Sequence, residues 1–227
     1  MKITAKFREF ENESGTMKGY ADLYVDGSVG IKDVRLMNGS HGMFLGMPTV
    51  KVGDEYKEVV TGVSKEFAAQ ALEAVLAAKE SEEKRASIGE AGNLFYDAHA
   101  TALQASDKST KALASLTIRG EKDAKKSAFT INNIRVVQGE KGLFASMPSE
   151  KTENPDFPYN SLCVITKENV GFVNNLIVAK AKDALGIERK SNLEDRVGEA
   201  KEKAAKDSKK AGKEKTQKKE KESGRAE

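Results

Sequence analysis

The chain contains few of the residues that build disulfides, zinc sites and membrane spans. Its 227 residues include one cysteine, two histidines, four prolines and no tryptophan. The single cysteine, Cys163, excludes an internal disulfide, and with His41 and His99 it supplies at most three of the usual zinc ligands. No apolar run approaches the length of about 18 residues that a transmembrane helix needs, and no signal-peptide core follows Met1. We therefore expect a cytoplasmic protein that binds neither a metal nor a membrane.

Residue arrangements that are typical of enzymes are also missing. The sequence contains no nucleophile with a neighbouring base, no phosphate-binding loop between a strand and a helix, and no pair of carboxylates expected on one face. His99 and Cys163 lie in strand-like surroundings, where such residues more often pack than react. The sequence therefore predicts a protein that is not an enzyme, with neither catalytic residues nor a cofactor.

The excess of positive over negative charge lies at one end of the chain. Lys and Arg number 38 against 35 Asp and Glu, a net charge of +3. Residues 188–227 hold 14 basic and 10 acidic residues, which leaves 24 basic and 25 acidic residues for residues 1–187. The terminal segment has only Leu193 and Val197 as large aliphatic residues, too few to offset the entropy of ordering it. We predict that 188–227 is a lysine-rich, low-complexity tail that is flexible or helical.

An internal repeat organises the rest of the chain. Residues 31–48 and 131–148 align without a gap and share seven identical residues, among them an arginine, two glycines, a phenylalanine and a Met-Pro pair. The match extends to two further pairs of segments: 18–27 with 111–120, and 63–66 with 165–168. We therefore expect two related units of one small fold.

Each unit has the pattern of strands followed by a helix. Alternating apolar and polar residues predict strands, and the Gly-x-x-Gly segments at 39–42 and 139–142 predict tight turns between strands. Proline should end the strands that follow, at Pro48 and Pro148. We expect the closing helices to begin at the caps Ser64 and Thr166. The residues expected to be buried are Phe67, Ala71, Leu72, Val75 and Leu76 in the first helix, and Val170, Val173, Ile177 and Val178 in the second.

These segments resemble the SpoVG family, the stage V sporulation protein G or septation proteins. The resemblance rests on the MKIT start, the I-x-x-[VI]-R strand and the G-x-x-G-[ML]-F-x-x-M-P-[ST] pattern at 39–49 and 139–149. It implies an α+β fold in which each unit is a twisted antiparallel β-sheet with a C-terminal α-helix. The expected organisation is unit one at 1–80, a helical linker at 81–93, unit two at 94–187 and the tail at 188–227.

The family resemblance also implies partners. SpoVG proteins are known as homodimers paired through their sheets, and as DNA-binding and RNA-binding regulators of sporulation, septation and virulence genes. Because two units share this chain, we expect them to pair as an intramolecular pseudo-dimer, with further self-association left open. Such pairing would cover a strand edge that otherwise promotes aggregation.

The chain departs from the family pattern at the basic positions. Family members commonly have Arg-Lys after the Met-Pro-Ser, whereas this chain has Val50-Lys51 and Glu150-Lys151. Where the family has a basic residue at the start of the helix, the nearest positions here hold Ala68 and Val170. These losses favour an alternative function, a protein-interaction scaffold that has lost its nucleic-acid contacts.

The candidate nucleic-acid contacts are basic residues at repeated positions and in the tail. Arg35 and Arg135 recur in the same strand, where each is able to reach a phosphate or to pair with a neighbouring carboxylate. The further candidates are Lys51 and Lys151 past a strand end, Lys65 and Lys167 at helix starts, and Lys209, Lys210, Lys218 and Lys219 in the tail.

The tail supplies the clearest electrostatic argument. Between residues 198 and 221 it has ten lysines and five acidic residues. Such a segment binds DNA or RNA weakly and in a salt-dependent manner, or only keeps the protein soluble. We expect a regulator that binds nucleic acid and is linked by resemblance to sporulation and septation. The lysine-rich tail favours this function over the scaffold.

Overall fold

The structure is a computed structural model that describes residues 1–10, 15–104, 109–120 and 129–187. All of these residues belong to one unit of the chain, Met1–Ile187. The second unit, Glu188–Glu227, coincides with the predicted tail and lies outside the described residues, as do its four candidate lysines. Neither described helix combines the length and the apolar character needed to cross a membrane.

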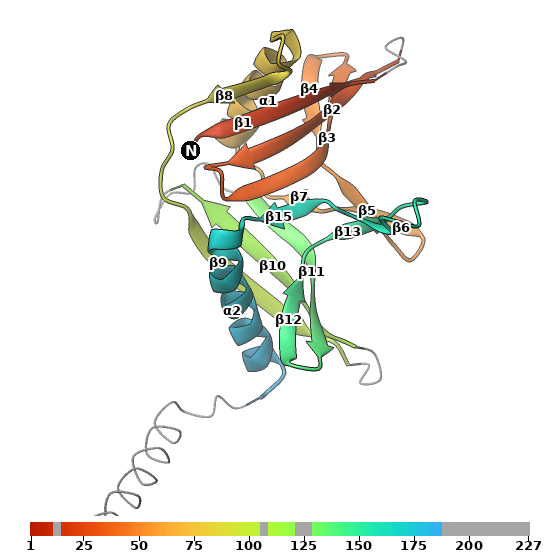
Figure 1. The fold of residues 1–227 in the computed structure, drawn as a ribbon, viewed down its shortest axis with the longest axis vertical. Helices are drawn as coiled ribbons and strands as arrows, with labels where there is room; N and C mark the ends of the chain where they lie inside the picture. The colour runs from red at the N-terminus through yellow and green to blue at the C-terminus, as the bar shows by residue number, and fades with distance from the viewer. Residues whose placement is uncertain (11–14, 105–108, 121–128, 188–227) are drawn as a thin grey trace, which may run out of the picture. The chain divides into compact units, whose positions relative to one another are not determined.

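Each repeat contributes four antiparallel strands that pair in chain order (Figure 1). In the first repeat they are β1 (Ile3–Glu9), β2 (Met17–Val25), β3 (Val29–Gly39) and β4 (Gly42–Gly46). In the second they are β9 (Phe95–Ala102), β10 (Thr110–Arg119), β11 (Phe129–Gly139) and β12 (Gly142–Ser146). Residues on these strands alternate between buried and less buried, which is the period-two pattern that the sequence predicts.

The two Gly-x-x-Gly segments form the turns into β4 and β12, as predicted. Gly42 and Gly142 have φ angles of 104° and 114°, a region that favours glycine. Strands β4 and β12 end at Gly46 and Ser146, shortly before Pro48 and Pro148. The turn interpretation of these glycines is therefore confirmed.

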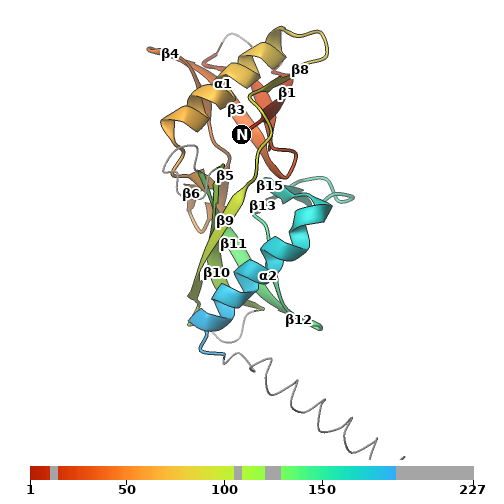
Figure 2. The ribbon, with the colours of Figure 1, turned by 90° about the vertical axis from the view of Figure 1, so that its left-hand side faces the viewer.

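One helix of each repeat covers one face of its own sheet (Figure 2). These helices are α1 (Lys65–Glu80) and α2 (Lys167–Ala184). Ser64 caps α1 as predicted, because its Oγ accepts a hydrogen bond of 3.2 Å from the backbone N–H of Phe67. Thr166 occupies the same position before α2, but its hydroxyl makes no capping hydrogen bond.

Of the nine helix residues expected to be buried, five are buried, three are partly buried and one is exposed. Phe67, Ala71 and Val75 are buried in α1, and Val173 and Ile177 in α2. Leu72, Leu76 and Val178 are partly buried. The prediction for Val170 was wrong, since its side chain is 47% exposed. The buried stripe of α2 has a spacing of four residues from Val173 to Ala181, and Val170 lies on the same side of the helix, about one turn before the stripe begins.

Residues 81–93 do not form the helical linker that was expected. The helix α1 ends at Glu80, and strand β8 (Arg85–Ile88) then pairs antiparallel with β1. Along β8 partly buried Ala86 and Ile88 alternate with exposed Arg85 and Ser87. A period of two fits a strand rather than a helix, and the edge of β1 supplies the backbone partners.

Two further strand pairs form hairpins that follow the Met-Pro segments. These are β5 (Thr49–Val52) with β6 (Glu55–Glu58), and β13 (Ser149–Lys151) with β14 (Tyr159–Ser161). Strands β5 and β13 contact one another although they belong to different repeats. The hairpins therefore lie next to each other where the two repeats meet.

After its hairpin, each repeat gives a short strand to the sheet of the other repeat. Strand β7 (Val60–Thr61) pairs with β11, and β15 (Cys163–Ile165) pairs with β3. The same backbone bond occurs on both sides: the N–H of Lys32 donates to the carbonyl of Leu162 at 2.8 Å, and that of Asn132 to Val59 at 2.7 Å. Two repeats of one chain thus complete each other's sheets.

A β-bulge lies beside each exchanged strand. On β3 the buried residues are Ile31 and then Val34, so one extra residue separates them. Asp33 and Asn133 take the bulge positions, with φ angles of 57° and 58° that short polar side chains tolerate. Because of the bulge, β3 is able to pair with β15 before Asp33 and with β4 after it.

The exchange also joins the cores of the two repeats. Phe67 of α1 lies against Phe129 of β11, with ring centroids 4.7 Å apart, and both side chains are fully buried. An apolar contact of this size couples the stability of one repeat to that of the other.

We predict that replacing Phe67 with Ala lowers the free energy of unfolding by about 3–5 kcal/mol, because the change leaves a cavity between the repeats. Both repeats should then unfold in a single transition at a lower urea concentration, measured by circular dichroism. Phe144→Ala is the matched control, since Phe144 is 45% exposed and its loss should cost far less. Two separate transitions in the wild-type protein would contradict the coupling.

Candidate functional site

The repeated arginines lie beside the exchanged strands. Arg35 on β3 faces Tyr20 of β2 and Gly46 of β4. A Cβ at Gly46 would lie 3.5 Å from Nε of Arg35, which is an ordinary van der Waals contact. Arg135 on β11 faces Leu113 of β10 in the same register. The two arginines therefore have equivalent backbone positions and different neighbours.

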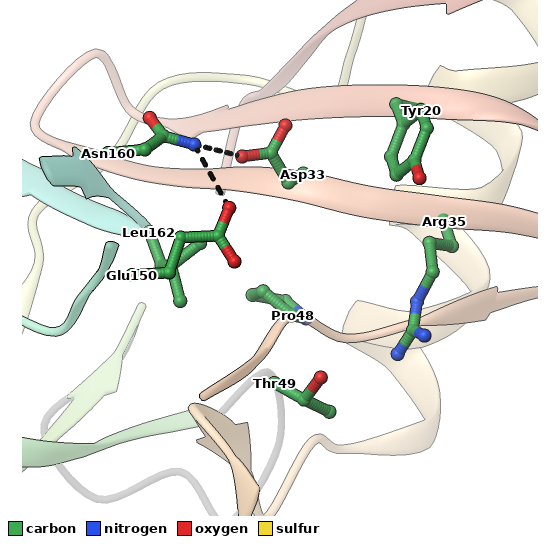
Figure 3. A pocket seen from close by; sticks show the side chains of 8 residues that line it. All are labelled: Tyr20, Asp33, Arg35, Pro48, Thr49, Glu150, Asn160 and Leu162. Carbon is green, nitrogen blue, oxygen red and sulfur yellow. Dashed lines mark hydrogen bonds between the residues drawn. The ribbon is translucent and has the colours of Figure 1, made fainter. Parts of the chain in front are cut away.

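A cavity of about 340 Å³, which we call the first pocket, opens beside Arg35 (Figure 3). It is built from both repeats, because the β13–β14 hairpin brings residues of the second repeat to the strands of the first. Its lining consists of Tyr20, Asp33, Arg35, Pro48 and Thr49 from the first repeat and Glu150, Asn160 and Leu162 from the second.

Asp33 is the centre of the hydrogen-bond network in the first pocket. Its carboxylate accepts hydrogen bonds from Arg8 at 2.6 Å and from the side-chain amide of Asn160 at 2.7 Å. Partial burial lowers the pKa of Arg8, but the bond to Asp33 and the charges of Asp22 and Asp33 raise it above its ordinary value overall. The negative charge of Asp33 is therefore compensated within the protein.

Two charged groups of the first pocket keep free hydrogen-bonding capacity. Arg35 donates one bond of 3.0 Å to the carbonyl of Met47 and makes no ion pair with any described residue. Among the described residues, the Glu150 carboxylate accepts one long contact, of 3.5 Å, from the side-chain amide of Asn160. Figure 3 shows Tyr20 and Arg35 on one side of the pocket and Glu150 and Asn160 on the other, with Pro48 between them.

A second pocket, of about 230 Å³, lies beside Arg135 and is the counterpart of the first. It takes Leu113, Asn133, Arg135, Pro148 and Ser149 from the second repeat and Val50, Lys51 and Val52 from the first. Leu113, Asn133 and Val50 stand where the first pocket has Tyr20, Asp33 and Glu150. The lining of the second pocket contains two cations and no carboxylate.

The structure thus brings together two candidates that the sequence placed separately. Lys51 comes from the hairpin of the first repeat and Arg135 from a strand of the second. Both side chains are exposed, and neither has a hydrogen bond or an ion pair within the described part of the chain. The sequence suggested that Arg35 and Arg135 either contact a phosphate or pair with a neighbouring carboxylate. Among the described residues, neither arginine pairs with a carboxylate.

The other candidate lysines of the folded unit lie elsewhere. Lys65 and Lys167 begin the two helices, and Lys151 belongs to β13. All three are exposed, and none of them lines either of the two pockets. Lys51 and Lys151 occupy equivalent positions in the two repeats, but Lys51 lines the second pocket and Lys151 lines neither pocket.

Of the polar residues of the first pocket, sequence reasoning found only Arg35 and missed Tyr20, Asp33, Thr49, Glu150 and Asn160. Tyr20 aligns with Leu113 and Glu150 with Val50, so the differences between the repeats carried a signal for these two. Asn160 had no such signal, because it reaches Asp33 only through the crossing of the hairpin.

The cysteine and histidines do not form a reactive or metal-binding cluster in the part of the chain that is described. No group of three or more His, Cys, Asp or Glu side chains is placed to hold a metal ion there. His41 and His99 are exposed. Cys163 is buried in the exchanged strand β15, and this burial raises the pKa of its thiol to about 12.

The family assignment follows from comparison with known proteins. The SpoVG family model matches the chain twice, at residues 1–81 and 98–181. The chain belongs to the SpoVG family. Its two SpoVG copies correspond to the two repeats, and the mixed α+β fold that the resemblance implies is the fold observed.

Individual SpoVG relatives each match about one repeat. "Putative septation protein SpoVG 1" of Listeria monocytogenes is 34% identical over 82 residues, which are 35% of this chain and 79% of that protein. "Putative septation protein SpoVG" of Agathobacter rectalis is 38% identical over 77 residues, which are 32% of this chain and 74% of that protein. Septation is the process that the names of these relatives give.

We predict that Cys163 reacts with a thiol reagent at pH 8 far more slowly in the folded than in the urea-unfolded protein. The raised pKa keeps the thiol protonated at this pH, and the burial of Cys163 in the exchanged strand β15 blocks access. The unfolded chain loses the thiol proton near the ordinary pKa of about 9, whereas the folded chain keeps it until about pH 12. Cys163 therefore lowers the free energy of unfolding as the pH rises from about 9 toward about 12. Labelling as fast as in urea would show that β15 detaches readily.

Proposed function

We propose that this SpoVG protein is a regulator that binds nucleic acid in the cytoplasm through phosphate contacts of Arg135 and Lys51 and through the lysine-rich tail. The observation that carries the proposal is the second pocket, where two exposed cations from different repeats line one cavity without a carboxylate. Arg offers a planar fork for phosphate oxygens and Lys a mobile point charge, a combination suited to a backbone phosphate.

The charge distribution favours weak and salt-dependent binding. The folded unit has 24 basic and 25 acidic residues, so it provides no general attraction for a polyanion. The attraction must come from the local pair in the second pocket and from the tail, whose 14 basic residues exceed its 10 acidic residues. The first pocket is a poorer phosphate site, because the carboxylates of Asp33 and Glu150 line it together with Arg35.

The strand exchange supports a proposal about assembly. The two SpoVG copies complete each other's sheets within one chain, so we propose that the chain acts alone as an intramolecular pseudo-dimer. A role in septation or sporulation control rests on the names of the relatives and on the family resemblance.

Exposed aromatic residues on the hairpins favour a second candidate function, a protein-interaction scaffold. Tyr56 and Phe157 are each 71% exposed and Tyr159 is 63% exposed, all in or beside the hairpins where the repeats meet. Such residues are common at protein interfaces. Absence of any nucleic-acid complex at low salt, together with a stable complex with another protein, would favour the scaffold.

We predict that Arg135→Ala and Lys51→Ala each weaken binding of a labelled single-stranded oligonucleotide and reduce the slope of log K against log salt by roughly 0.7. Fluorescence anisotropy across a salt series measures both quantities. Lys151→Ala is the matched control, because it removes the same charge at the equivalent position of the other repeat, outside both pockets. Equal losses for Lys51→Ala and Lys151→Ala would show that only total charge matters.

We also predict that deleting residues 188–227 weakens binding and flattens the salt dependence, because the deletion removes a net charge of +4. The same anisotropy series on the truncated protein measures this effect. If affinity and slope stay unchanged, the nucleic-acid site is confined to the folded unit.

A further inference from the structure

Compared with the second pocket, the first pocket is less suited to a phosphate and better suited to a planar polar ligand. Relative to the second pocket, it has Tyr20 in place of Leu113, Asp33 in place of Asn133 and Glu150 in place of Val50. It keeps the arginine, the proline and a hydroxyl residue that both pockets share. The second repeat therefore provides a comparison within the same chain, in which the arginine, the proline and the hydroxyl residue are shared and the other lining residues differ.

The polar groups of the first pocket form two opposed sets. On one side, Arg35 has donors beyond its bond to Met47, and Tyr20 adds a hydroxyl and an aromatic ring. On the other side, the Glu150 carboxylate is an acceptor with one long contact within the described part of the chain. Pro48 and Leu162 contribute apolar surface to the lining. A flat ligand that fits must offer acceptors at one edge and donors at another.

We infer that the first pocket binds a guanine base, either unpaired in a single strand or free as a nucleotide. Guanine presents the acceptors N7 and O6 on one edge, which an arginine fork matches, and N1–H and N2–H₂ donors on an adjacent edge, which a carboxylate matches. The ring of Tyr20 and the face of Pro48 supply surfaces for stacking. Uracil and thymine lack an exocyclic amino group for Glu150, and adenine lacks the O6 acceptor for Arg35.

The surroundings favour a base rather than a phosphate. Asp33 is already engaged by Arg8 and Asn160, so it holds Asn160 and the pocket wall in place instead of binding the ligand. The uncompensated carboxylate of Glu150 would repel a phosphate but accepts hydrogen bonds from N1 and N2 of guanine. This inference for single strands rests on the proposed function and adds a base preference to it.

The test compares a short labelled oligo(dT) with the same strand carrying one central guanine, by fluorescence anisotropy with the full chain. We expect the wild type to bind the guanine strand about tenfold more tightly than oligo(dT). Inosine at that position, which lacks the N2 amino group, and 7-deazaguanine, which lacks the N7 acceptor, should each lose most of this preference. These two probes report on Glu150 and Arg35 respectively.

The variants replace residues of the first pocket with those at the equivalent positions of the second pocket. Tyr20→Leu and Glu150→Val should abolish the guanine preference, measured as the ratio of the affinities for the guanine strand and for oligo(dT). Glu150→Gln, which keeps the shape of the side chain, should have the same effect if Val causes misfolding, which circular dichroism detects. Glu153→Val is the matched control, since it removes an exposed charge nearby that lines neither pocket.

The outcomes separate this inference from the proposed function. Oligo(dT) binding that depends on Arg135, without any guanine preference and without binding of GMP, overturns the guanine site and leaves the phosphate site intact. Binding of GMP that Glu150→Gln abolishes, without binding of any oligonucleotide, supports the guanine site, assigns it to the free nucleotide and overturns the proposed function. Binding of neither GMP nor any strand overturns both.

Discussion

The backbone hydrogen bonds that join β7 to β11 and β15 to β3 hold the two repeats in one unit, and both candidate pockets depend on them. Each exchanged strand follows a hairpin, so the exchange carries that hairpin to the arginine strand of the other repeat. Lys51 reaches Arg135 in this way, and Asn160 reaches Asp33. Without the crossing, each repeat would retain its arginine but lose the other half of its pocket.

The same backbone frame surrounds two pockets of different chemistry. The bulge residues Asp33 and Asn133 have nearly the same φ angle, and each arginine has the same strand register. The electrostatic character is then set by a few side chains, because Glu150 in one hairpin is Val50 in the other. A repeated fold within one chain permits such divergence, since the two copies mutate independently. A symmetric homodimer has two identical pockets by necessity.

Local features of the fold were accessible from the sequence. The repeat, the Gly-x-x-Gly turns, the strands that end before proline and the cap at Ser64 depend on residues that are near each other in the chain. The mistakes occurred where pairing at long range decides the outcome. Residues 85–88 form an edge strand because β1 offers backbone partners, although the preceding residues are helical. Val170 is exposed because the sheet contacts a stripe that begins at Val173.

By itself, the sequence determined that two SpoVG units are present and that basic residues recur at Arg35 and Arg135, since identity and order along the chain carry this information. It also placed the excess positive charge in residues 188–227. Only the tertiary structure decided which charges share a pocket. Lys51 joins Arg135 while Lys151 lines neither pocket, and Glu150 faces Arg35. The physical reason is that the strand exchange depends on backbone pairing between distant segments, which no local pattern of residues specifies.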